Sequence, residues 1–176
     1  MLHGISSKNF PEFNFCGYEQ KVVVAFSFGV FLSGIIPLNA DENFAFNGTL
    51  KPVDNKHGIR EIIFKKTLEN LSPETYRRFI SNMFENDEDS LRFFGNRSDP
   101  DIAELKQELV FIDKLSQNHN VEKTFNKAFI SKNDRIFTYN NQVKFWSDTK
   151  TEIVDCGHFP FYNFSSWDEI VKQCRK

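Results

Sequence analysis

Residues 21–36, KVVVAFSFGVFLSGII, decide the fold of this chain, because a β-branched run stops there at a serine and an apolar run begins. Residues 22–24 (VVV) form the continuous apolar run that is typical of a strand buried on both faces. Residues 28–36 continue at helix length, and Pro37 predicts the end of that helix. The stretch therefore predicts a strand, a sharp turn at Ser27 and a helix, in that order.

The sequence around the serine, AFSFG at residues 25–29, resembles the G-x-S-x-G motif of a nucleophile elbow. Such an elbow strains the backbone of its serine, so we expect small residues two positions before and after it, here Ala25 and Gly29. The following helix would aim its first N–H groups at the site, which makes Phe28 N–H the candidate oxyanion donor. The alternative is a buried strand and helix with Ser27 as an ordinary N-cap, and the motif alone fits both interpretations.

The composition predicts one globular domain over residues 1–176, with 40% hydrophobic and 26% charged residues. The 21 phenylalanines can fill a core or line an acyl pocket, and core filling is the commoner use. A net charge of −2 and a pI near 6.1 argue against a nucleic-acid partner.

The cysteines indicate whether the chain holds a metal or a disulfide, and the apolar runs indicate where in the cell it works. Three widely spaced cysteines without a C-x-x-C pair argue against a disulfide framework or a zinc site, and we predict no metal and no cofactor. The N-terminus has no apolar signal core, and the longest apolar run, residues 25–38, is shorter than the ~20 residues of a membrane span. We therefore expect a soluble, cytoplasmic protein with no membrane partner.

Strands and helices alternate beyond the elbow. Residues 43–47 (NFAFN) predict a short strand followed by a turn at Gly48. Ser72 and Asp99 each precede a proline and are expected as helix N-caps. The block from about residue 58 to 118 is longer than a crossover requires, so it predicts a helical lid over the active-site edge of a mostly parallel α/β sheet. The expected helices after the first are 59–71, 73–84, 100–116, 142–146 and 167–173.

Two later strands are each followed by a residue suited to catalysis. Residues 128–131 (AFIS) precede Asp134, and residues 151–154 (TEIV) precede His158. In α/β-hydrolases the triad follows the chain order serine, acid, histidine, with the last two after successive late strands. Because parallel strands bring their carboxyl ends to one edge, we expect Ser27, Asp134 and His158 to form a catalytic triad.

Each of these residues also has a purely structural interpretation. Asp134 can be a turn residue, and His158 can be packed among the phenylalanines that follow it. The chain order and the placement after successive strands favour the triad. His3, His57 and His119 are weaker candidates for the base.

Five segments of the chain resemble the BioG-type pimeloyl-[acyl-carrier-protein] methyl ester esterases, which are α/β-hydrolases of biotin synthesis. The resemblance extends over nearly the whole chain from Tyr18 onward. It implies hydrolysis of the methyl ester on a pimeloyl chain carried by acyl carrier protein, with Ser27, Asp134 and His158 as the triad. The matching segments are AFSFGV at 25–30, FNGTLKPVDNKHGI at 46–59, FKKTLENLSPETYRRF at 64–79, SKNDRIFTYNNQVKFW at 131–146 and GHF at 157–159.

The implied partner, acyl carrier protein, is acidic, which makes basic residues of the predicted lid candidates for docking it. These candidates are Lys65, Lys66, Arg77, Arg78 and Arg92. A solvated helix face is the alternative for each of them.

The resembling family has further strands and a Gly-rich segment before the elbow, and that segment supplies a second oxyanion N–H. Here 26 residues precede Ser27. We therefore expect an α/β-hydrolase-like fold that is truncated at its N-terminus. Two alternatives to a working esterase follow: a catalytically impaired remnant that binds carrier protein, and a serine hydrolase of another short acyl ester.

Overall fold

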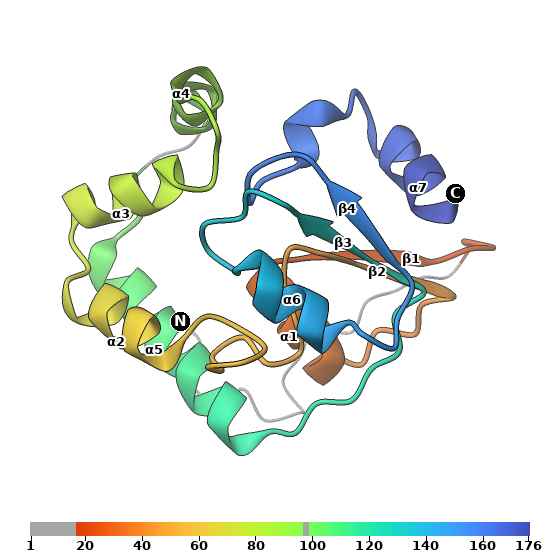
Figure 1. Cartoon of the computed structure of the whole chain (residues 1–176), viewed down its shortest axis with the longest axis horizontal. Coiled ribbons are helices and arrows are strands. Elements are labelled where there is room, and N and C mark those ends of the chain that lie inside the picture. Colours follow the sequence, from red (N-terminus) through yellow and green to blue (C-terminus); the bar gives the residue numbers. More distant parts are fainter. Residues whose placement is uncertain (1–16, 97–98) are drawn as a thin grey trace.

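The computed structural model describes residues 17–96 and 99–176 and contains one four-stranded sheet (Figure 1). Its strand order is β1-β2-β3-β4, and each neighbouring pair is parallel. The sheet agrees with the α/β architecture that the sequence predicts. The strands are β1 (Val22–Phe26), β2 (Glu42–Phe46), β3 (Lys127–Ser131) and β4 (Thr151–Val154).

The helices of the described residues follow the strands in two groups. One group covers the faces of the sheet, and the other lies between β2 and β3 in the sequence. The first group is α1 (Phe28–Ile35), α6 (Tyr139–Phe145), the short 3₁₀ helix η1 (Phe161–Asn163) and α7 (Trp167–Arg175). The second group is α2 (Glu61–Glu69), α3 (Pro73–Ser81), α4 (Asp87–Gly95) and α5 (Ile102–Asn118).

The two faces of the sheet differ because side chains alternate along each strand. Ala25, Ala45 and Ala128 are register partners on one face, and these small side chains let Val30 of α1 and Trp146 pack closely over them. That face is covered by α1 and α6.

The residues that directly follow these three alanines are phenylalanines, and they lie on the opposite face of the sheet. Phe26, Phe46 and Phe129 are register partners there, and the rings of Phe46 and Phe129 stack with centroids 4.3 Å apart. Ile170 and Cys174 of α7 pack against this face. Much of the chain's phenylalanine content therefore fills core, as the composition suggests.

Strand β1 is less buried than its apolar run predicts. Val22, Val23 and Val24 are half-buried, and Ala25 alone in this strand is fully buried. The reason is topological, since β1 is an edge strand among the strands that the structure describes. The expectation of burial on both faces was wrong for this strand.

Besides shifts in the bounds of several helices and the unpredicted η1, the helices differ from the sequence prediction at two places. Helix α4 was not predicted, and its N-cap is Asn86, whose side chain accepts a hydrogen bond from Asp89 N–H. Helix α5 is capped by Asp101, whose carboxylate accepts from Ala103 N–H, and not by Asp99. The Asp99 carboxylate pairs instead with Arg77 at 2.6 Å.

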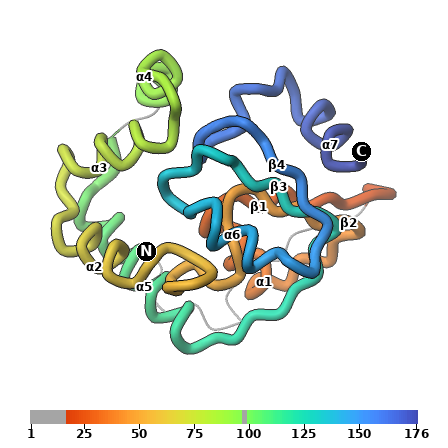
Figure 2. The backbone as a smooth tube through the Cα atoms, in the orientation of Figure 1, coloured from red at the N-terminus to blue at the C-terminus, as the bar shows by residue number. Residues whose placement is uncertain are grey.

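Ser72 caps α3 as predicted, and its hydroxyl accepts from Thr75 N–H in a reciprocal capping box. Helices α2 to α5 gather on one side of the sheet, away from α7, as the tube in Figure 2 shows. Within residues 17–96 and 99–176, no helix combines the length and apolar character needed to cross a membrane.

Candidate active site

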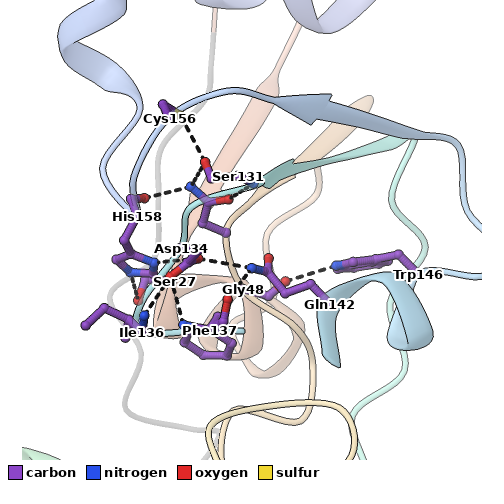
Figure 3. A network of polar contacts seen from close by, with 11 residues as sticks. Ser27, Gly48, Ser131, Asp134, Ile136, Phe137, Gln142, Trp146, Cys156 and His158 are labelled. Carbon is purple, nitrogen blue, oxygen red and sulfur yellow. Dashed lines mark hydrogen bonds and ion pairs between the residues drawn. The ribbon is translucent and has the colours of Figure 1, made fainter. Parts of the chain in front are cut away.

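Three of the sequence-predicted residues meet at one edge of the sheet (Figure 3). Ser27 directly follows β1, Asp134 lies three residues after β3, and His158 lies four residues after β4. Ser27 Oγ lies 3.0 Å from His158 Nε2, and His158 Nδ1 lies 2.9 Å from Asp134 Oδ2. The parallel strands thus deliver a serine, a histidine and a carboxylate into one hydrogen-bonded chain.

Ser27 has the backbone conformation of a nucleophile elbow. Its φ is 55° and its ψ is −129°, a left-handed region that costs about 1–3 kcal/mol for a residue with a side chain. The side chain makes no capping hydrogen bond to α1, so it is not an ordinary N-cap. Its N–H donates to Phe46 O of β2 at 3.0 Å, which ties the turn to the sheet.

The space around the elbow differs from the expectation in one respect. Apart from its chain neighbours and the backbone of α1 itself, a Cβ on Gly29 would meet no atom within 4 Å, so tertiary packing does not require a glycine there. Gly48 is the residue that must be small, because a Cβ on it would lie 2.2 Å from Ser27 O and 3.0 Å from Ser27 Cα. Ala25, which precedes the serine by two residues, is buried in the core between α1 and the sheet.

Phe28 is the first residue of α1, where an N–H group has no partner within the helix. Phe28 directly follows Ser27 in the sequence, and its N–H lies at the positive end of the helix dipole. The position suits an oxyanion donor.

The Asp134 carboxylate is fully buried and well supplied with hydrogen-bond donors. Its Oδ1 accepts from Ile136 N–H at 2.8 Å and Phe137 N–H at 2.9 Å, which is the turn role that sequence reasoning offered as an alternative. Its Oδ2 accepts from His158 and from Gln142 Nε2 at 3.0 Å. Asp134 therefore makes the turn with one oxygen and contacts His158 and Gln142 with the other.

The contact with Asp134 also fixes the tautomer of His158. A carboxylate can only accept, so His158 Nδ1 carries the proton and Nε2 offers a lone pair to the Ser27 hydroxyl. The imidazole is 1% exposed. It lies against Phe137, with nearly parallel rings and centroids 6.0 Å apart, and against Phe26 at 4.8 Å.

Sequence reasoning missed three residues that support this chain of contacts. Gln142 is fully buried and donates to both Asp134 and Phe137 O, while its own Oε1 has no partner among the described residues. Trp146 Nε1–H donates to Gly48 O at 3.0 Å and so fixes the glycine that packs on Ser27. Asn47 contacts the backbone of His158. All three lie in segments that carry the family resemblance, but no local pattern distinguishes them.

A cavity of about 400 Å³ opens over the Ser27 hydroxyl and the His158 ring. Its walls are mostly apolar side chains from α2, α3 and α5, including Phe64, Ile80 and Leu109. Arg135, which is exposed, also lines it. The helices of the predicted lid and the carboxyl edge of the sheet thus enclose one apolar chamber with the serine at its base.

The other histidines lie elsewhere. His57 lies in the loop before α2, where its Nδ1 is 3.4 Å from Asp54 Oδ1. His119 follows the last turn of α5, and its Nδ1 contacts Leu115 O at 3.1 Å. Neither lines the chamber over Ser27. His3 lies outside the described residues.

The five basic candidates for docking lie on α2, α3 and α4 and are exposed. Lys65 and Lys66 are neighbours on α2. Arg77 pairs with Asp99, Arg78 lies 3.7 Å from Glu74, and the Arg92 guanidinium stands 4.1 Å above the Tyr162 ring.

The two cysteines of the described part of the chain are buried thiols. Burial raises the pKa of Cys156, which also contacts Ser131 Oγ at 3.0 Å. Burial raises the pKa of Cys174 to about 12. Within residues 17–96 and 99–176, no group of three or more His, Cys, Asp or Glu side chains is arranged to hold a metal ion.

Comparison with known proteins identifies the family of this chain. The model of the family "Pimeloyl-ACP methyl esterase BioG" matches residues 7–170. The chain belongs to the BioG family. Crystallised BioG from Haemophilus influenzae has the same fold, with a TM-score of 0.82 and 27% identity over 90% of this chain and 76% of that one.

Relatives by sequence extend the comparison. A malonyl-[acyl-carrier protein] O-methyltransferase of Bacteroides fragilis is 35% identical over 159 residues, which are 88% of this chain and 31% of that protein. An uncharacterised protein of H. influenzae is 27% identical over 90% of this chain and 76% of its own length. The chain thus spans about a third of the first relative and three quarters of the second.

Two further structures share the fold. An esterase from Exiguobacterium antarcticum has a TM-score of 0.60 at 14% identity, covering 88% of this chain and 63% of that one. A serine hydrolase from the bacterium Cycloclasticus zankles has a TM-score of 0.52 at 18% identity, covering 81% and 58%. The chain therefore has the α/β-hydrolase fold of these two structures.

Proposed function

We propose that this chain hydrolyses the methyl ester of a pimeloyl chain carried by acyl carrier protein, in biotin biosynthesis, with Ser27, His158 and Asp134 as its catalytic triad. The observation that carries the proposal is the continuous hydrogen-bonded chain from Ser27 Oγ through His158 to Asp134, at the base of an apolar chamber. Membership of a family of pimeloyl-ACP methyl esterases supplies the substrate class.

The reaction uses the hydrogen-bonded triad in two half-reactions. Ser27 Oγ attacks the ester carbonyl while His158 Nε2 takes the hydroxyl proton, and the resulting imidazolium is stabilised by Asp134. The tetrahedral intermediate collapses, the proton passes from His158 to the departing methoxy oxygen, and methanol leaves. Water then attacks the acyl-serine with His158 again as base, which releases the free carboxylate and restores the Ser27 hydroxyl.

The oxyanion that forms in each half-reaction needs hydrogen-bond donors. Phe28 N–H, at the first position of α1, is one such donor in this proposal. Removing a single oxyanion donor typically costs ~10²–10³ in kcat, so the position of this N–H contributes strongly to the rate.

Residues 58–118 serve as a lid that shapes the acyl site. Their helices supply the apolar wall opposite Ser27, including Phe64, Ile80 and Leu109. Each methylene group buried in such a chamber contributes about 0.8 kcal/mol. A pimeloyl chain therefore suits this chamber better than a polar acyl group does.

The carrier protein docks on the exposed cations of the lid in this proposal. Lys65 and Lys66 on α2 and Arg77, Arg78 and Arg92 on α3 and α4 present positive charge to an acidic partner. The name of the Bacteroides relative also concerns a methyl ester on carrier protein, because an O-methyltransferase of malonyl-carrier protein forms such an ester. An esterase removes one.

The proposal is tested with purified chain in two assays. Intact mass after exposure to a fluorophosphonate reports an activated serine, and release of methanol reports turnover of carrier-bound methyl pimelate. We expect a single adduct and measurable turnover in the wild type, and the loss of both in Ser27→Ala and His158→Ala. Ser147→Ala, which changes an exposed serine, is the matched control and should leave both unchanged.

The outcomes separate the alternatives. An adduct with turnover of free methyl pimelate at the same kcat/KM as the carrier-bound ester would point to a general short-chain esterase. Binding of carrier protein without any adduct would indicate a catalytically impaired chain. A folded chain that gives no adduct and no turnover contradicts the proposed activity.

A further inference from the structure

A residue at or near the site follows the carboxyl end of each of the four strands. Three of these residues have roles in the proposed reaction. Ser27 follows β1, and Asp134 and His158 follow β3 and β4. The residue that follows β2 is Asn47, which is 1% exposed. It has no role in the chemistry proposed above.

Asn47 uses its amide on two neighbouring segments at once (Figure 3 draws Ser131 and His158 among these contacts). Its Oδ1 accepts from Ser131 N–H at 2.7 Å, and its Nδ2 donates to Ser131 Oγ and to His158 O, each at 2.7 Å. The partners fix the orientation of the amide, because a backbone N–H must face Oδ1 and a backbone carbonyl must face Nδ2.

The backbone of Asn47, like that of Ser27, has a positive φ. Its φ is 47°, and within the described residues these two are the non-glycine positions with positive φ. Its N–H donates to Phe129 O at 3.0 Å, which extends the pairing of β2 with β3 by one residue. Asparagine tolerates this conformation better than most residues, and observed strain of this kind gathers at functional sites.

The loop that carries His158 depends on few other anchors. Phe159 N–H donates to Met83 O at 3.0 Å on the lid side, and Asn133 N–H donates to Cys156 O at 3.2 Å. Ser131 Oγ, which Asn47 contacts, also lies 3.0 Å from Cys156 Sγ. Asn47 therefore holds this loop from the sheet, directly at residue 158 and through Ser131 at residue 156.

We propose that Asn47 is a positioning residue, whose buried amide holds the backbone of His158 so that the imidazole lies between Ser27 and Asp134. This inference rests on the proposed function, and it adds the residue after β2 to the three that follow the other strands. Without the amide, the His158 carbonyl loses its donor, and the backbone that carries the imidazole loses its bond to the sheet.

The test compares Asn47→Asp and Asn47→Gly with Ser131→Ala. Both Asn47 variants tolerate a positive φ, but the first replaces the donor to His158 O with an acceptor and the second removes the amide. Ser131→Ala removes the Asn47–Ser131 side-chain contact and leaves the contact between Asn47 and His158. Asn140→Asp, at an exposed asparagine of α6, is the matched control for the change of charge.

Two readouts distinguish positioning from a structural role. The first is the rate constant of fluorophosphonate labelling per folded chain, with its pH profile. The second is the far-downfield proton resonance of the His158 N–H bonded to Asp134, which needs no activity. We expect labelling to fall 10- to 100-fold in both Asn47 variants, with a changed pH midpoint, and the resonance to vanish in Asn47→Gly. Ser131→Ala and Asn140→Asp should label within threefold of the wild type and keep the resonance.

Three results would overturn the inference. Folded Asn47 variants that label at the wild-type rate with the same pH midpoint would contradict it, as would a loss of labelling in Ser131→Ala equal to that in Asn47→Gly. Failure of both Asn47 variants to fold would make the residue structural. If the wild type is not labelled at all, the proposed activity fails, and the resonance alone then decides the role of Asn47.

Discussion

Gly48 offers the sharpest test of how the elbow is held. A Cβ on this residue would lie 2.2 Å from Ser27 O, more than 1 Å inside an ordinary contact of 3.4 Å. Neither side yields easily, because Ser27 N–H is bonded to β2 and Gly48 O accepts from Trp146. We therefore expect Gly48→Ala to displace the serine by about 1 Å.

The displacement predicts both a stability loss and a rate loss. Overpacking of a tight site costs about 1–3 kcal/mol, which lowers the melting temperature of a chain of this size by roughly 2–12 °C. A misplacement of about 1 Å costs on the order of 10²-fold in rate. Thermal unfolding by circular dichroism and fluorophosphonate labelling of Ser27 measure the two effects on Gly48→Ala.

Gly29→Ala is the matched control, because a Cβ there meets no atom within 4 Å. Replacing a helical glycine by alanine stabilises by up to about 1 kcal/mol, so this variant should melt at or above the wild-type temperature and keep its labelling rate. The reasoning is refuted if Gly48→Ala melts and labels like the wild type, or if Gly29→Ala loses as much as Gly48→Ala.

Three further predictions concern the surroundings of the site and the opposite face of the sheet. Gln142→Met removes one of the four hydrogen-bond donors to Asp134, so fluorophosphonate labelling of Ser27 should fall about 10-fold. The variant also removes the unpartnered Oε1, which limits the loss in free energy of unfolding to about 1–2 kcal/mol, as measured in urea. Glu152→Gln leaves the buried Lys127 ammonium without its counter-charge and should cost about 2–3 kcal/mol at pH 7. Burial acts to raise the pKa of Glu152, but the hydrogen bonds from Lys127 and Gln173, together with the charges of Lys127 and Lys176, lower it overall. The difference in stability between variant and wild type should therefore shrink as the pH falls below about 4. Cys174, whose pKa is raised to about 12 by burial, should resist iodoacetamide at pH 8 in the native chain and react in urea, as peptide mass mapping will show.

Each of these three predictions has its own contradicting outcome. A Glu152→Gln chain that unfolds at the wild-type urea midpoint at pH 7 would mean that Lys127 is solvated despite its burial. Rapid alkylation of Cys174 in the native chain would mean that α7 opens readily from the sheet. Equal labelling of Ser27 in Gln142→Met and the wild type would show that three donors suffice for Asp134.

Local sequence patterns were enough to predict much of this protein. The break from β-branched to helical residues at Ser27 predicted β1, the elbow and α1, and the strands before Asp134 and His158 placed those residues at the same edge. These predictions succeed because the carboxyl ends of parallel strands must meet, whatever the rest of the chain does. The cap at Ser72 was equally local, since the capping partner lies three residues away.

Tertiary structure alone decided the contacts between distant residues. Asn47 meets Ser131 and His158 across 84 and 111 positions, and Gly48 meets Trp146 across 98, so no window of sequence contains both partners. Asp99 pairs with Arg77 and does not cap α5. The valines of β1 are half-buried because that strand lies at an edge of the described sheet. The sequence by itself determined which residues stand at the strand ends, and packing between the strands determined which of their neighbours hold them there.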